Sequence, residues 1–140
     1  MGGEISARCE TIEKCYEFML AYAGQGLSGG EGSTSSGQVR DYLERAAGAV
    51  DGLAQAYAAA VKKENLGPAE SYRAFLGVLE RDAQDALAAI QLVLAQPTIS
   101  SQLIDNLNAS IHLRALLTDL FLIDEILKPQ RIQERPATAE

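Results

Sequence analysis

A chain of 140 residues, of which 47% are hydrophobic, is long enough for one folded domain and too apolar to remain disordered. Its 19 acidic and 12 basic residues give a formal net charge of −7, which weighs against nucleic acid and anionic membranes as partners, because both require a concentrated basic face. No run reaches the ~18 apolar residues of a membrane span. Two cysteines that we expect to be reduced favour a cytoplasmic protein.

The first predicted helix covers residues 4–23. Its apolar residues recur every three or four positions and define one face, made of Ile5, Cys9, Ile12, Tyr16, Met19 and Ala23. Cys9 belongs to this face and is interpreted as a small buried group, whereas Cys15 lies on the flank. Since the two thiols point to different sides of the helix, they form neither a disulfide with each other nor a C-x-x-C metal clip. A redox role for Cys9 or Cys15 is left open.

A Gly- and Ser-rich segment, GQGLSGGEGSTSSG, occupies residues 24–37. It contains LSGGE, which is similar to the signature segment of ABC-type ATPases. That segment acts as one wall of a nucleotide site, and this chain has no G-x-x-x-x-G-K-[ST] phosphate loop to supply another. We therefore interpret the segment as a flexible interhelical loop of about 13 residues.

The second and third predicted helices cover residues 37–64 and 68–95. Ser35 and Gln38 are positioned to form a capping box at the start of the second helix. The link Asn65-Leu66-Gly67-Pro68 offers Gly67 as a helix cap and Pro68 as the first residue of the next helix. Because this link is short, we expect an antiparallel hairpin. The apolar faces of the two helices are Val39, Leu43, Ala46, Val50, Leu53, Tyr57 and Ala60, then Tyr72, Leu76, Leu79, Ala83, Ala86, Ile90 and Val93.

The fourth predicted helix begins after a cap at Thr98 or Ser100 and ends near Lys128, before Pro129. A domain of residues 1–128 and a mobile tail of residues 129–140 follow from that boundary. With no strand-like alternation anywhere, the four segments predict an all-α, up-down-up-down antiparallel four-helix bundle with the Gly/Ser-rich loop between its first two helices.

The second half of the fourth helix, LRALLTDLFLIDEIL at residues 113–127, is apolar around most of its circumference. Either this half is buried within the chain, or it carries a second contact surface. We favour the contact surface, since a four-helix bundle has no central helix. The residues assigned to an interface with a second copy or another protein are Leu113, Leu116, Leu120, Ile123 and Leu127.

Residue patterns give little support to catalysis or to a bound metal. A di-iron bundle needs two Glu-x-x-His motifs, and the chain has one histidine. A haem held by Met19 and His112 is disfavoured because the two residues lie at different levels of the predicted helices. Carboxylates such as Asp82, expected to pair with Arg81, are interpreted as solvated. We expect no catalytic residue, no metal ligand and no cofactor.

The sequence thus predicts a non-enzymatic helical protein that binds another protein or itself, as an adaptor, assembly factor, chaperone or regulator. One alternative is a phosphotransfer domain that uses His112 as the phosphoacceptor. Arg114 lies two residues on, about 200° around the helix, and is badly placed to assist a phosphoryl group there. A second alternative is a helical bundle that holds a ligand or cofactor.

Overall fold

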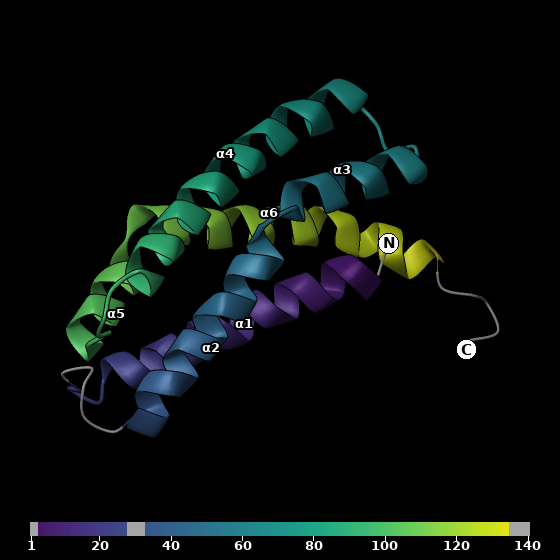
Figure 1. The fold of residues 1–140 in the computed structure, drawn as a ribbon. Helices are drawn as coiled ribbons and strands as arrows, with labels where there is room; N and C mark the ends of the chain where they lie inside the picture. The colour runs from purple at the N-terminus through teal and green to yellow at the C-terminus, as the bar shows by residue number, and fades with distance from the viewer. Residues whose placement is uncertain (1–2, 28–32, 135–140) are drawn as a thin grey trace.

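A computed structural model describes residues 3–27 and 33–134, which are helical along most of their length and contain no strand (Figure 1). The all-α prediction is confirmed. Within these ranges six helices take the place of the four predicted, because the second and fourth predicted segments are each divided in two. Their bounds are α1 Gly3–Ala23, α2 Ser33–Val50, α3 Leu53–Lys63, α4 Ala69–Leu94, α5 Ser101–Ala109 and α6 Ile111–Glu134.

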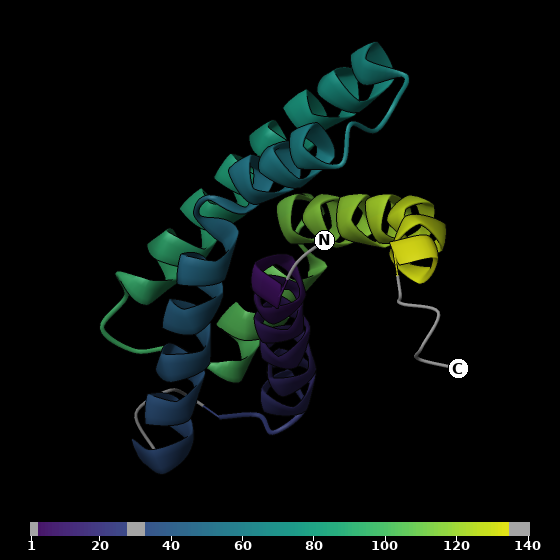
Figure 2. The same cartoon turned by 90° about the vertical axis from the view of Figure 1, so that its right-hand side faces the viewer.

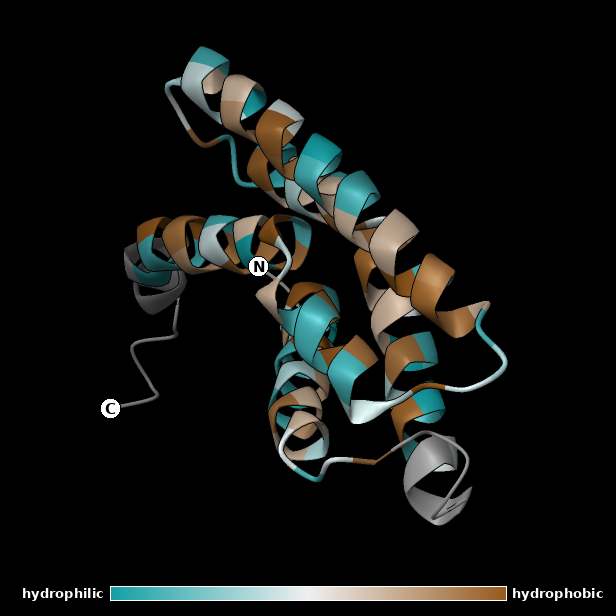
Figure 3. Cartoon of the chain, turned by 90° about the vertical axis from the view of Figure 1, so that its left-hand side faces the viewer, coloured by the Kyte–Doolittle hydropathy of each residue, from teal (hydrophilic) through white to brown (hydrophobic). Residues whose placement is uncertain are grey.

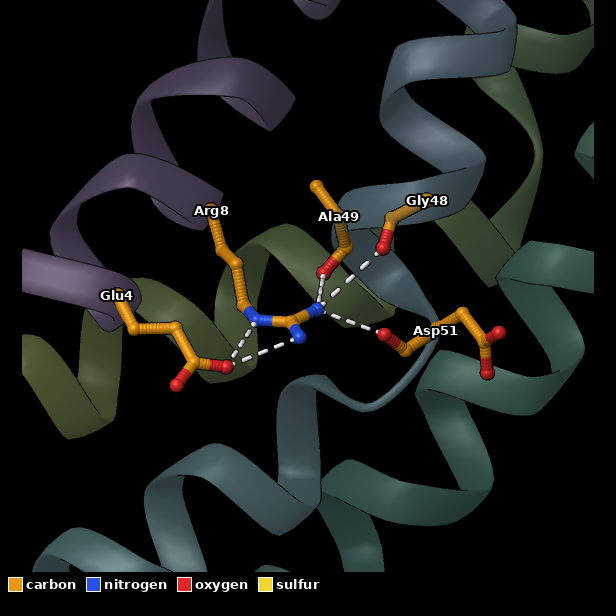
Figure 4. Close-up of polar contacts among 5 residues, drawn as sticks. All are labelled: Glu4, Arg8, Gly48, Ala49 and Asp51. Carbon is orange, nitrogen blue, oxygen red and sulfur yellow. Dashed lines mark hydrogen bonds and ion pairs between the residues drawn. The ribbon is translucent and has the colours of Figure 1, made fainter.

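The break between α2 and α3 lies at Gly52, whose φ of 84° is one that glycine adopts without strain. Arg8 of α1 fills the break, and its guanidinium also pairs with Glu4 at 3.0 Å (Figure 4). Its Nη1 donates to three carbonyl oxygens at 3.3, 2.9 and 2.6 Å, those of Gly48, Ala49 and Asp51. The carbonyl oxygens at the end of a helix have no intrahelical donor, and the guanidinium of Arg8 donates hydrogen bonds to them instead.

The break between α5 and α6 lies at Ser110, which is extended at φ −65° and ψ 144°. Its Oγ accepts a hydrogen bond of 3.3 Å from the backbone N–H of Leu113, so Ser110 caps α6. Ser100 caps α5 in the same way, at 3.1 Å from the N–H of Leu103, as one of the two predicted caps. A serine inside the predicted fourth helix therefore starts a new helix.

Helices α1 and α2 pack side by side, and α5 lies against α1. The α3–α4 hairpin projects away from this base, and its link bends at Asn65, whose φ is 54°, and not at the expected Gly67. Pro68 precedes the first residue of α4. Helix α6 packs against α4 near the base, and the two helices diverge toward the end of the hairpin (Figure 2).

The core follows the predicted apolar faces with two differences. In α1 the buried positions shift from Tyr16 to Cys15 and from Ala23 to Tyr22, so the buried face repeats at a slightly shorter interval than the predicted face. In α4 the residues from Leu79 onward are buried as predicted, but Tyr72 and Leu76 are only half-buried. The first turns of α4 therefore lack the cover that the rest of the helix has.

Two predicted boundaries are corrected. The connection after α1 comprises residues 24–32 and is shorter than predicted, because α2 begins at Ser33 and includes the proposed capping box. Most of LSGGE, residues 28–31, lies outside the described residues. Helix α6 continues past Pro129 to Glu134, although a proline inside a helix removes one backbone donor. The predicted tail thus begins as helix, and residues 135–140 lie outside the described ranges. No helix in those ranges is long and apolar enough to cross a membrane.

Candidate binding groove

An open groove of about 300 Å³ lies where α4 and α6 diverge. One wall comes from the start of α4 and the other from the second half of α6. Hydrophobic residues recur along both helices (Figure 3). The lining residues are Gly67, Pro68, Ser71, Tyr72, Phe75, Leu122, Ile123 and Ile126.

The α6 wall exposes large apolar side chains. Leu122 is 50% exposed and Ile126 is 47% exposed. On the opposite wall, Tyr72 and Phe75 are half-buried. Single exposed apolar residues are normal in proteins, but aromatic and aliphatic residues that gather in one concave site indicate a binding surface.

The five residues predicted for the interface lie inside the chain. Each is at most 3% exposed, and Ile123 also lines the floor of the groove; the five are Leu113, Leu116, Leu120, Ile123 and Leu127. In the single chain these side chains are occupied by intrachain packing, and their assignment to an interface stays a prediction. Self-association itself stays a prediction, and the exposed large apolar side chains of α6 are Ile111, Phe121, Leu122 and Ile126.

A buried polar contact holds the inner side of α6. The hydroxyl of Tyr57 donates to Oδ1 of Asp124 at 2.7 Å and lies 3.3 Å from Sγ of Cys9. Burial raises the pKa of Tyr57 well above its usual range, and the hydrogen bonds with Cys9 and Asp124 raise it further. Tyr57 therefore remains a protonated donor, and the contact joins α1, α3 and α6.

A pair of carboxyl groups faces across the α4–α6 contact. Asp119 of α6 is 8% exposed, and its Oδ2 is buried with no hydrogen-bond partner among the described residues. Burial raises the pKa of Asp119 to about 7, and the neighbouring carboxyl group of Asp82 on α4 acts in the same direction. Asp82, which the sequence pattern indicates as solvated, is half-buried, because its α4 face packs against α6.

The remaining sequence candidates do not gather into one site. His112 is exposed near the start of α6, whereas Met19 is 1% exposed in the core, so the two meet different surroundings. The phosphotransfer alternative for His112 stays a prediction. Cys15, expected on the flank, is 2% exposed, and burial raises its pKa to about 12. Within residues 3–27 and 33–134, no three His, Cys, Asp or Glu side chains are grouped to hold a metal.

The sequence pattern predicts the groove residues only in part. The apolar circumference of residues 113–127 correctly signals that α6 has two apolar sides, but periodicity favours the longer stripe, which is the buried one. No family model matches this sequence, and comparisons with curated proteins and with solved structures give no match either. Support for a function therefore comes from the groove and its surroundings.

Proposed function

We propose that this protein is a non-enzymatic, cytoplasmic binding protein that holds an apolar segment of another protein in the groove between α4 and α6. The observation that carries the proposal is the pairing of two apolar walls across an open groove. Leu122 and Ile126 stand half-exposed on one wall, opposite Tyr72 and Phe75 on the other.

The chemistry of the groove favours a protein segment over other ligands. Aromatic and aliphatic side chains are the groups that receive the apolar face of an amphipathic helix. A formal net charge of −7 favours partners with basic residues beside their apolar face.

The magnitudes agree with a weak or moderate complex. Full burial of a large apolar side chain contributes about 1.5–3 kcal/mol. Leu122 and Ile126 are already about half-buried, so covering them contributes on the order of 1 kcal/mol each. A micromolar complex requires about 8 kcal/mol, and the aromatic wall of α4 and the side chains of the partner must supply the difference.

Peptide binding tests the proposal. The probe is a fluorescent amphipathic helical peptide with leucines at positions i, i+3, i+4 and i+7, titrated with the protein and followed by anisotropy. Leu122→Glu combined with Ile126→Glu should abolish binding, because it places two charges on the apolar wall. Ile111→Glu is the matched control, since Ile111 is 75% exposed on the same helix but does not line the groove.

Two results contradict the proposal. One is equal affinity of the peptide for the parent protein and for the Leu122→Glu, Ile126→Glu variant. The other is loss of binding in Ile111→Glu alone. Light scattering on the same samples measures self-association, and a dimer that the double variant dissociates identifies a second copy as the occupant.

A further inference from the structure

The two walls of the groove continue inward along single helix faces. On α4, positions 72, 75, 79 and 82 are three or four residues apart and share one side of the helix. On α6, positions 119, 122 and 126 are likewise three or four residues apart and share one side of that helix. Leu79 is fully buried, so the groove closes before it reaches Asp82 and Asp119. The carboxyl pair therefore stands at the inner end of the two walls.

A single proton satisfies the buried pair. A carboxylate oxygen that is buried without a donor is costly, and Oδ2 of Asp119 is such an oxygen. When Asp119 is protonated, its hydroxyl can donate to the carboxylate of Asp82, and one negative charge remains. When both groups are ionised, two like charges repel each other in a poorly solvated site.

We propose that Asp82 and Asp119 share one proton that fastens α4 to α6 at the inner end of the groove, and that loss of this proton lets the two walls separate. The effect of this proton on partner binding rests on the proposed function of the groove. A groove of about 300 Å³ is narrow for the side chains of an inserted helix, so separation of the walls favours binding. Proton loss thus raises the affinity of the groove.

The other charged groups on the helices that pack here have different surroundings. Glu80 of α4 accepts hydrogen bonds from Gln55 and Gln84, and Arg40 of α2 donates to carbonyls at the end of α4. Asp124 of α6 is bound to Tyr57 of α3. The exposed titratable and charged groups on α4, α5 and the first turns of α6 are Glu70, Arg73, Arg81, Asp85, Asp105, His112 and Arg114. The pKa of about 7 places the titration of the pair in the physiological range.

Distances between spin labels on α4 and α6 test this proposal without any partner. Ala74 of α4 and Glu125 of α6 are exposed and are replaced by cysteine for labelling, while the native cysteines are buried. In the otherwise native protein, the distance should increase from pH 5.5 to pH 8.5 with a midpoint near 7. In Asp119→Asn, whose amide donates to Asp82 at every pH, the short distance should persist.

Controls separate this inference from the proposed function. Asp85→Asn removes an exposed carboxylate of α4 and should leave the pH-dependent distance unchanged. If Asp119→Asn does not fold, Asp82→Asn serves instead and should remove the midpoint near pH 7. The inference fails if the parent shows no change in distance, or if either substitution at the pair leaves the change intact. Failure of peptide binding with an intact pH response would instead reject the groove as a peptide site.

Discussion

The hydroxyl of Tyr57 on α3 donates a hydrogen bond of 2.7 Å to Asp124 on α6, and this contact holds the side of α6 that lies opposite Leu122 and Ile126. Leu122 and Ile126 lie two residues before and after Asp124, about 200° around the helix in either direction. With Asp124 held against α3, both side chains are turned toward the groove. A polar contact in the interior thus orients an apolar wall at the surface.

Tyr57→Phe removes this contact and leaves Asp124 half-buried without its donor. We expect the free energy of unfolding to fall by about 1–3 kcal/mol, as for other buried groups that lose a partner. Urea denaturation followed by circular dichroism measures the change. Tyr16→Phe is the control, because Tyr16 is also half-buried and its substitution should change stability by less than about 0.5 kcal/mol. Equal effects of the two substitutions would contradict a specific role for the contact.

Substitution of Gly48 and of Gly52 by alanine should change the stability of the protein in opposite directions. Gly52 has a φ of 84°, and a Cβ there would lie 3.4 Å from Nη2 of Arg8, so Gly52→Ala should destabilise the protein by about 1–2 kcal/mol. Gly48 lies inside α2, and a Cβ added there would meet no atom within 4 Å, so Gly48→Ala should stabilise the protein by about 0.5–1 kcal/mol. Thermal unfolding of both variants measures the two signs, and a stabilising Gly52→Ala would rule out the break as described.

The sequence allows the helical class and most of the core to be predicted, because burial imposes a period that polar residues interrupt. The two breaks escape prediction for different reasons. Gly52 lies off the apolar face of its segment and does not interrupt the apolar period, and only the distant Arg8 completes the helix end there. Ser110 is one of several polar residues in its segment, so nothing in the local pattern identifies it as a cap.

The site is harder to predict because it depends on how helices diverge. Tyr72 and Leu76 belong to the same period as Leu79, and only the direction of α6 leaves the first two half-buried. Similarly, Asp82 and Asp119 are 37 positions apart in the sequence and meet only through packing of α4 against α6. Periodicity places residues on faces but does not say where two faces separate.

The two cysteines should resist thiol reagents while the protein is folded. Cys15 is 2% exposed and Cys9 is 8% exposed, and burial raises the pKa of Cys15 to about 12, so the reactive thiolate is scarce at neutral pH. Absorbance after addition of an aromatic disulfide should show almost no reaction in buffer and two reactive thiols in urea. Ala74→Cys, at an exposed position, should react at once. Rapid reaction of the parent protein in buffer would show that α1 is not packed as described.

Stability should fall as the pH rises from about 4 to about 7. The pKa of Asp119 is raised from its ordinary value of 3.8 to about 7 in the folded state, so the folded protein binds the proton more strongly than the unfolded chain does. The resulting stabilisation is complete below the ordinary value and is lost as the pH passes 7. The net charge of −7 adds a general dependence on pH, so the informative quantity is a difference between variants.

Asp119→Asn should remove this component and flatten the urea midpoint between pH 4.5 and pH 8, whereas Asp85→Asn, at an exposed position, should retain the slope of the parent. Above pH 7 the asparagine variant should be the more stable protein, since it keeps a donor toward Asp82 and introduces no second charge. An increase in parent stability through the same interval would show that Asp119 is ionised in the folded state. The two carboxyl groups would then be separated or solvated, and they could not fasten α4 to α6.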